Sequence, residues 1–236
     1  DNTHLLVMAP RRLAEKRMEV AIRAGEFTIK PSESESLLGI RVHQSMTWNH
    51  HIKEGKGSVL KQLTTRVNGL KKLSYKADVK TKLMIANGIV ISKLSYGLSM
   101  WGNCQGYLRK ALQVAQLNAA RAVCGYGSFY WSTKKLLKAC NWLSVNQLYW
   151  QQVLTTHKVL LSKKPVNIYS RMVTRHNHST RAAAGESRGF GNKVVKSSFN
   201  YSATKYNSLP AKIRETTNLT SFKTQLRNWV ERNIEM

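Results

Sequence analysis

The spacing of apolar residues changes near Trp48, and this change limits the kinds of fold that the chain can form. Upstream, Val20 and Ile22 alternate with polar residues, as do Phe27 and Ile29, which is the period expected of strands. Downstream, apolar residues recur every three or four positions, as in a helix that packs on one side. We therefore expect an α+β fold that is mostly α, with short N-terminal strands or a hairpin followed by a helical bundle and a further helical region.

Four short segments upstream of Trp48 have the features of strands. The first is the apolar run Thr3–Met8, and the next two lie on either side of Gly25. Leu37–Val42 is the fourth. The alternating serines and glutamates at 32–36 are expected to form a polar turn before it.

Five segments downstream have helical apolar spacing: Val59–Leu73, Val79–Tyr96, Tyr107–Val123, Ser144–Leu161 and Ser221–Ile234. The fourth opens with Ser144 followed by Gln147 three residues later, which is the pattern of a capping box. In the third, the leucines and alanines are expected to face inward, with Gln113 and Gln116 largely off that stripe. The alanines would allow a neighbouring helix to approach closely.

Charge is the strongest indication of what the chain binds. Its 38 Lys and Arg against 12 Asp and Glu leave a formal net charge of +26. Such an excess repels itself in a compact fold unless a polyanion screens it, so nucleic acid is the leading partner. An anionic membrane is the competing partner, but the sequence has no apolar run long enough to span a bilayer and no N-terminal signal segment. The start at Asp1 rather than Met predicts a fragment or a processed chain.

The sequence offers no active site. Two-metal phosphoryl transfer needs paired carboxylates, whereas the acids here are scattered and include no adjacent Asp pair, which also disfavours a nuclease. There is no glycine-rich phosphate loop and no nucleophile elbow. Cys104, Cys124 and Cys140 are too far apart for a zinc knuckle. We expect reduced thiols, no cofactor or metal, and a location in the nucleus or cytoplasm or both.

Two further features remain open on sequence alone. Trp101, Trp142, Trp150 and Trp229 lie among apolar neighbours and are expected in the core, whereas the aromatic residues of 126–131 are expected to be exposed and able to stack on bases. Residues 176–208 are poor in aliphatic residues and rich in Gly, Ser, Asn and Arg. They fit a solvated linker and a strand-binding arm equally well.

A series of short motifs, in this order, resembles the C-terminal part of non-LTR (LINE-like) retrotransposon reverse transcriptases. The motifs are Leu37–Ile40 (LLGI), Trp48–Ile52 (WNHHI), Lys93–Gly97 (KLSYG), Met100–Gly102 (MWG), Asn118–Val123 (NAARAV), Trp142–Leu148 (WLSVNQL) and Ser221–Lys223 (SFK). The resemblance covers nearly the whole chain. It is more specific in the helical part than at Asp1–Met8.

The resemblance implies a domain order. Residues 1–52 would be the end of the palm with the primer-grip hairpin and its connection, and 53–104 the thumb helices that rest on the template–primer duplex. Residues 105–172 would be a helical extension, 173–218 the basic polar loop and 219–236 a C-terminal helix. The family's catalytic aspartates would lie upstream of Asp1, so the chain alone is not expected to be an enzyme, and Mg²⁺ would belong to the missing palm. Partners would be RNA, RNA–DNA hybrid or DNA, and the upstream palm and fingers.

The resemblance also implies which residues contact nucleic acid. These are Leu38, Gly39 and Arg41 of the hairpin, Lys61, Arg66, Lys71, Lys72, Lys80 and Lys82 of the thumb, and Arg109, Lys110 and Arg121 of the extension. Where the family has a lysine in its Asp-Lys-Thr strand, this chain has Asn2. That departure and the absent palm acids motivate the alternative: a repurposed, standalone basic helical scaffold that binds protein partners.

Overall fold

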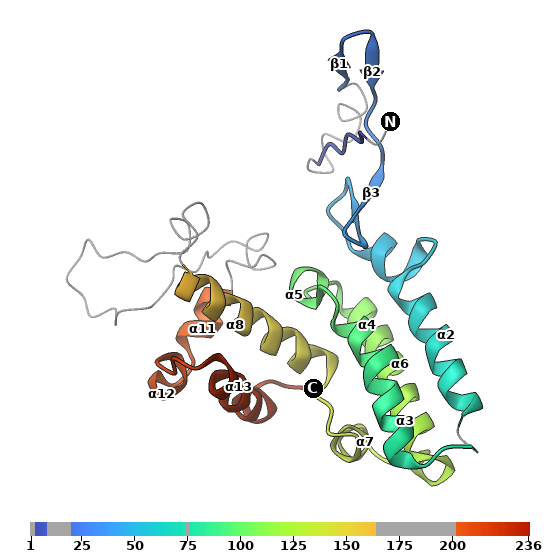
Figure 1. The fold of residues 1–236 in the computed structure, drawn as a ribbon, viewed down its shortest axis with the longest axis vertical. Helices are drawn as coiled ribbons and strands as arrows, with labels where there is room; N and C mark the ends of the chain where they lie inside the picture. Colours follow the sequence, from blue (N-terminus) through green and yellow to red (C-terminus); the bar gives the residue numbers. More distant parts are fainter. Residues whose placement is uncertain (1–2, 9–19, 74–75, 164–201) are drawn as a thin grey trace, which may run out of the picture. The chain divides into compact units, whose positions relative to one another are not determined.

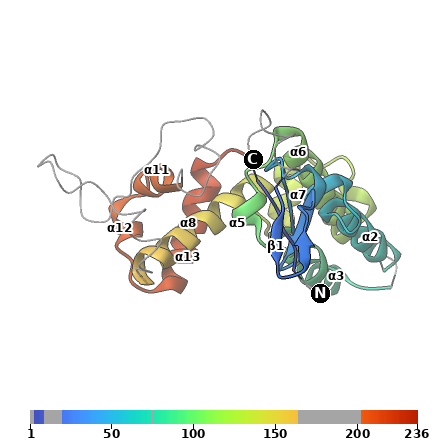
Figure 2. The same ribbon diagram turned by 90° about the horizontal axis from the view of Figure 1, so that it is seen from above.

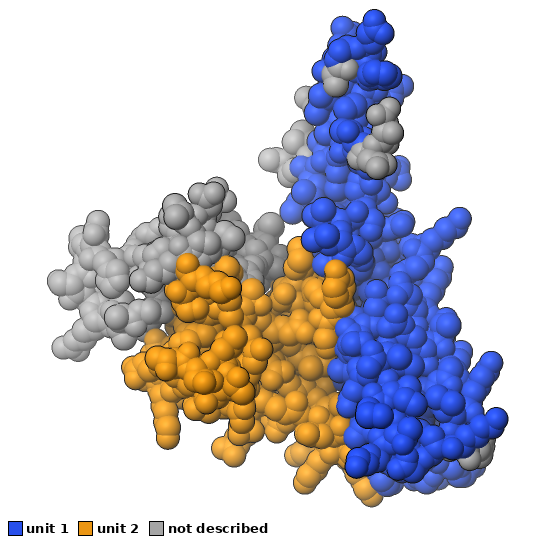
Figure 3. Space-filling model, in the orientation of Figure 1, with its two compact units in different colours: residues 1–94, 104–132 blue, residues 95–103, 133–236 orange. Residues whose placement is uncertain are grey.

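The computed structural model describes residues 3–8, 20–73, 76–163 and 202–236. It is mostly helical, with short antiparallel hairpins near the N-terminus, so the predicted α+β, mostly α class is confirmed (Figure 1). The chain forms two compact units. Unit 1 contains residues 1–94 and 104–132, and unit 2 contains residues 95–103 and 133–236 (Figure 3).

Unit 1 begins with two hairpins. Strand β1 (Ile22–Ala24) pairs with β2 (Phe27–Ile29), and β3 (Ser34–Leu37) pairs with β4 (Ile40–His43). Both pairs are antiparallel, and the second places Leu37 opposite Ile40. A two-residue turn therefore joins β3 to β4.

The predicted strands differ from these in three places. The expected turn at 32–36 is largely strand β3, and the expected single strand 37–42 is interrupted by the turn at Leu38 and Gly39. Alternating Ser and Glu suit a strand that is largely solvent-accessible on both faces, so polarity alone does not indicate a turn. In Thr3–Met8 the structure has only a bridge between Leu5 and Pro31.

The helices of unit 1 follow the predicted segments closely. The π-helical turn η2 (His50–Glu54) leads to α2 (Val59–Lys72). A second segment contains α3 (Val79–Ala86), the π-helical η3 (Asn87–Ile91) and α4 (Ser92–Ser95) without a break. The third is α6 (Gly106–Cys124), which ends in the 3₁₀ turn η4 (Tyr126–Ser128).

Helix α6 packs against both α2 and α3, so the core of unit 1 lies between these helices (Figures 1 and 2). Leu63 and Leu70 of α2 are buried, as are the predicted inward-facing residues of α6: Leu108, Leu112, Ala115, Ala119 and Ala122. Gln116 is the exception: it is fully buried, and its side-chain oxygen accepts a 2.9 Å hydrogen bond from Gln113. Because α6 belongs to unit 1, the segment expected as a separate extension, 105–172, is divided between the two units.

Unit 2 is built around α8 (Val145–Lys163). Helices α5 (Leu98–Trp101), α11 (Ser202–Asn207) and α13 (Leu219–Asn233) pack on it, and α12 (Ala211–Arg214) packs on α13 (Figures 1 and 2). Its hydrophobic core contains the following buried residues: Leu154, Tyr206, Leu209, Ile213, Phe222, Leu226, Val230 and Ile234.

Four helices in the described part of unit 2 were not predicted from the sequence. Two are α5 and α7 (Thr133–Ala139), and the others, α11 and α12, lie in the stretch expected to be a basic loop. Tyr206, Leu209 and Ile213 are spaced three and four apart and are buried, which is a helical pattern too short to stand out from its polar surroundings. Residues 164–201 of that expected loop lie outside the described residues.

The predicted capping box of α8 is confirmed. The Ser144 backbone N–H donates to Gln147 Oε1 (3.0 Å), and the Gln147 N–H donates to Ser144 Oγ (3.2 Å). Gln147 also donates through Nε2 to the carbonyl of Ile234 (3.0 Å), which ties the start of α8 to the end of α13. Of the predicted core tryptophans, Trp101 and Trp142 are buried, whereas Trp150 and Trp229 are partly buried against the core.

Candidate nucleic-acid interface

The turn between β3 and β4 has two unusual features. Leu38 and Gly39 have positive φ angles, 49° and 76°. A two-residue hairpin turn of type I′ requires a positive φ at both of its central residues. A leucine in this region costs roughly 1 kcal/mol relative to a glycine or asparagine. The Leu38 side chain is also 81% exposed, so the hairpin holds an apolar group in water at its tip. Both predicted hairpin residues therefore lie where a ligand could reach them.

The base of this hairpin is joined to the first helical turn. The backbone N–H of Arg41, on β4, donates to Nδ1 of His51, on η2, at 3.2 Å. The Arg41 side chain passes beside Gly55, where an added Cβ would lie 3.5 Å from its Cδ. The predicted contact residue Arg41 is thus half-buried at the junction of strand and helix.

Arg41 and Lys93 act electrostatically on His51, and Arg66 acts on Lys93. We call these four basic residues the basic junction. Burial, followed by the charges of Lys93 and Arg41, lowers the pKa of His51 from 6.5 to about 4. Burial and the guanidinium of Arg66 lower the pKa of Lys93. The neighbouring charges that shift both groups are positive, so a bound anion would be favoured here.

Arg66 also has a structural role that the sequence did not indicate. Its Nη1 donates to the carbonyl of Ile89 at 2.6 Å, which links α2 to the π-helical segment η3. A π-helix shifts the usual backbone pairing by one residue, and side-chain donors can satisfy the carbonyls it redirects. Replacing Arg66 would therefore disturb the fold of unit 1 as well as its charge.

Four of the predicted phosphate contacts are exposed on α2 and α3: Lys61, Lys71, Lys72 and Lys80. Lys61 and Lys72 are eleven residues apart, which puts them on the same side of α2 at a distance of roughly 16 Å along its axis. A duplex carries one phosphate charge per about 1.7 Å of its own axis. A helix face of this length therefore spans several phosphates.

Lys82 is a correction to the predicted interface, because its side chain is only 5% exposed. It precedes Ala86 by four residues and Val90 by eight, and both of these are fully buried. Lys82 therefore lies on the apolar face of the helix, where its methylenes pack while its ammonium reaches toward the surface. The ammonium lies near Asp78, whose pKa is lowered by hydrogen bonds from Thr81 and, to a smaller degree, by Lys82.

The three predicted residues of α6 are less uniform. Lys110 is exposed, whereas Arg109 and Arg121 are half-buried. Arg109 donates to the carbonyl of Cys104 at 3.3 Å, and Arg121 donates to Oδ1 of Asn118 at 3.3 Å. Arg109 therefore fixes the residue before α6, Arg121 pairs with a neighbour on the same helix, and Lys110 is the clearest candidate for contact with a ligand.

Comparison with protein-family models, curated proteins and solved structures finds no match. Within the described ranges, no group of three or more His, Cys, Asp or Glu residues could hold a metal ion. No helix in the described part of the chain is long and apolar enough to cross a membrane.

The acid-free character of the middle of the chain was not singled out in the sequence. Residues 79–185 contain no Asp or Glu, so α6, α7 and α8 are entirely without acidic side chains. His51 and Lys93, which complete the basic junction, were also missed as site residues. They are far apart in sequence, and no spacing rule connects them.

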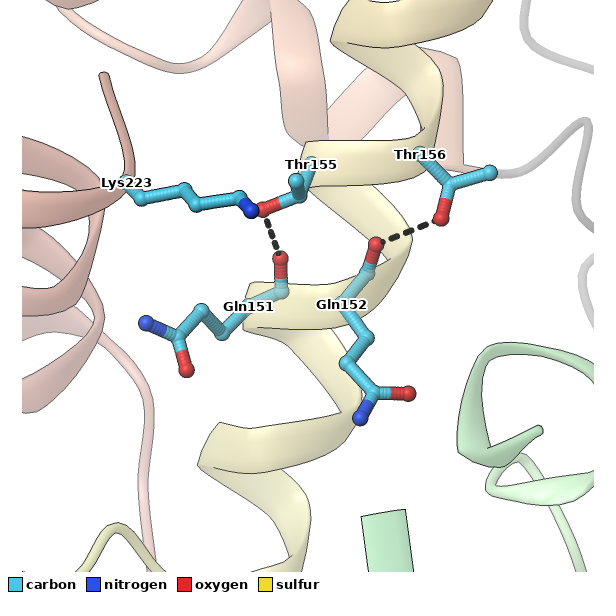
Figure 4. Close-up of a pocket in the computed structure, with 5 residues that line it drawn as sticks. All are labelled: Gln151, Gln152, Thr155, Thr156 and Lys223. Carbon is cyan, nitrogen blue, oxygen red and sulfur yellow. Dashed lines mark hydrogen bonds between the residues drawn. The ribbon is translucent and has the colours of Figure 1, made fainter. Parts of the chain in front are cut away.

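Unit 2 has an open polar groove between α8 and α13, with a volume of about 350 Å³ (Figure 4). Gln151, Gln152, Thr155 and Thr156 line it from α8, and Lys223 lines it from α13. The two threonine hydroxyls donate to carbonyls of their own helix, and Gln152 donates to the carbonyl of Ser95 (2.9 Å). Most of the lining is thus engaged in the fold, and none of the predicted site residues lies there.

Proposed function

We propose that this chain is the C-terminal part of a non-LTR retrotransposon reverse transcriptase and that it binds the duplex of template and primer. Its hairpin would hold the primer strand, and α2 and α3 would follow the phosphates. An upstream palm and fingers would supply the catalytic aspartates and their Mg²⁺. The chain alone would then bind nucleic acid without extending a primer.

The basic junction is the observation that carries this proposal. Hydrogen bonds there join the base of the β3–β4 hairpin to η2 and join α2 to η3, and burial, together with the neighbouring positive charges, lowers the pKa of His51 and of Lys93. Folding keeps these charges close together although they repel one another. A phosphate backbone would relieve that repulsion, and a small-molecule substrate would need a more enclosed site.

The exposed lysines of α2 and α3 define the test. A variant with Lys61, Lys71, Lys72 and Lys80 all changed to Gln should bind an RNA–DNA hybrid more weakly by on the order of 10³-fold at about 0.1 M salt, and its salt slope should fall by about three to four units. All four side chains are exposed, so the fold should be retained. Affinities are measured with a labelled template–primer hybrid across a salt series.

A matched control removes the same charge from another part of the chain. Lys134, Lys135, Lys138 and Lys223 are equally exposed but lie in unit 2, and their replacement by Gln should change the slope much less. Equal losses in the two variants would contradict a specific interface on α2 and α3. Primer extension by the chain alone would contradict the proposal that an upstream palm supplies catalysis. Weak binding without a preference for hybrid would favour the alternative, a basic helical scaffold that binds protein partners.

A further inference from the structure

A second surface of unit 1 lies at the far end of α6 from Lys110. Three aromatic side chains within five residues are largely exposed there: Tyr126 at 87%, Phe129 at 60% and Tyr130 at 94%. We call residues 126–130 the aromatic turn. Single exposed aromatics are common on proteins, but three in one short turn leave a large apolar area in water.

The backbone of the aromatic turn is well anchored. Ser128 is buried, and its Oγ and N–H both donate to the carbonyl of Gly125, at 2.6 and 3.1 Å. The N–H of Phe129 donates to the carbonyl of Tyr126 (3.2 Å), and that of Trp131 donates to Ser128 (3.1 Å). The turn therefore holds its rings outward from a fixed backbone.

The rings of Tyr126 and Phe129 do not stack face to face. The centroids of Tyr126 and Phe129 are 5.7 Å apart, and their planes meet at 52°, so the pair is tilted and not stacked. Together with the exposure of both rings, this angle leaves ring faces accessible to a planar ligand. A rigid ring with two side-chain torsions loses little entropy when it binds.

The sequence around the aromatic turn favours an anionic partner. It lies within the stretch from residue 79 to 185 that has no acidic residue. Arg121 is on the last turn of α6, just before it. Unpaired nucleotides combine a planar base with a charged backbone, and proteins bind them by stacking aromatic rings within a positive field.

We infer that the aromatic turn is a stacking site for unpaired nucleotides, so that unit 1 binds single-stranded RNA or DNA there in addition to duplex on α2 and α3. The inference rests on the proposed function in so far as both need a nucleic-acid ligand. It adds a second site, with a different chemistry: base stacking, where the first site uses phosphate contacts.

The test compares a triple variant, Tyr126→Ala, Phe129→Ala and Tyr130→Ala, with the unmodified chain. The probe is a labelled, unstructured pyrimidine oligonucleotide, and a second probe has the same length and phosphates but abasic positions. The triple variant should bind the first probe about tenfold more weakly for each ring that stacks. Its affinity for the abasic probe and for an RNA–DNA hybrid should not change, and its salt slope should remain the same because no cation is lost.

The control variant, Tyr126→Phe with Tyr130→Phe, retains the rings and should bind like the unmodified chain. Unchanged binding of the pyrimidine probe by the triple variant would overturn the inference while leaving duplex binding intact, and the rings would then be examined as a protein-docking surface. An equal loss for the abasic probe would also overturn it. If the unmodified chain bound neither probe nor hybrid at low salt, the proposed function itself would fail.

Discussion

In unit 2, the half-buried Lys158 donates to the carbonyl of Arg214 at the end of α12 and lies over the ring of Phe222. In unit 1, by contrast, Lys61, Lys72 and Lys80 extend into solvent. Arg227 similarly donates to the carbonyl and side chain of Asn141, just after α7 (2.7 and 2.9 Å). Cations at helix C-termini satisfy carbonyls that the helix itself leaves open. The same excess of positive charge thus stabilises helix ends around α8 and forms a candidate binding face on α2 and α3.

Two histidines buried in the described part of the chain show the same contrast. His51 in unit 1 and His157 in unit 2 both have pKa values lowered to about 4. For His157 the cause is burial alone, beside the ring of Tyr206 at 4.6 Å. For His51, positive neighbours add to burial. A ligand that neutralises charge should therefore affect only the first.

The largest expected effect is on stability in acid. Unfolded His157 binds a proton below pH 6.5, and the folded chain excludes it down to a pH of about 4, so stability falls as the pH drops through this window. The shift corresponds to about 3 kcal/mol for this one group. Urea unfolding at a series of pH values should show that loss, and His157→Gln should make the profile flatter. If the unfolding free energy of the His157→Gln variant fell with pH as steeply as that of the parent, groups other than His157 would cause the loss of stability.

Titration of both rings by NMR sharpens the comparison. Binding of the RNA–DNA hybrid should raise the pKa of His51 toward its ordinary value, while the pKa of His157 should remain at about 4. Equal movement of both values would indicate a general conformational change and would remove the special status of the basic junction.

Removal of the buried amide at the start of α8 should have the next largest effect. Gln147→Ala leaves the N–H of Ser144 and the carbonyl of Ile234 without their bonds in a buried place. The expected loss of stability is about 2 kcal/mol. Because Gln147 lies in unit 2, hybrid affinity measured where the variant is still folded should match that of the parent. Weakened binding would show that the two regions do not act separately.

Two neighbouring lysines on α3 provide a smaller test. Lys80→Gln removes an exposed charge and should weaken hybrid binding by roughly tenfold at about 0.1 M salt, with a slope lower by about one unit. Lys82→Gln removes a charge whose side chain lies in the apolar face, and it should leave the slope nearly unchanged. The opposite ranking in a salt series would show that Lys82 leaves its buried position to contact phosphate.

The smallest expected effect concerns Arg227 and Lys72. Arg227→Met should lower the free energy of unfolding by about 1 kcal/mol, since it removes hydrogen bonds to Asn141 that are partly open to water. Lys72→Gln should change that free energy by less than about 0.5 kcal/mol. For affinity to the RNA–DNA hybrid, Lys72→Gln should have the larger effect and Arg227→Met the smaller one. Equal stability effects would contradict the different uses of cations in the two regions.

The long helices could be predicted from the sequence because each buries one apolar stripe. The helix containing Leu63 and Leu70, the capping box at Ser144 and Gln147, and the class of the fold were all accessible in this way. The short helix α12 was not, because its single buried residue, Ile213, gives no periodicity by itself. The β3–β4 hairpin was misplaced because its first strand is polar.

Part of the candidate interface could likewise be predicted from the sequence, and part could not. The sequence determined that the chain is strongly basic, that lysines recur along α2 and α3, and that aromatic residues gather at 126–131. Only the tertiary structure decided which cations meet, because His51, Arg66 and Lys93 come from separate elements. It also decided that Lys82 is buried and that the aromatic turn is anchored by Ser128. Local spacing sets which face of a helix is apolar, but which distant side chains share one environment depends on how the helices pack.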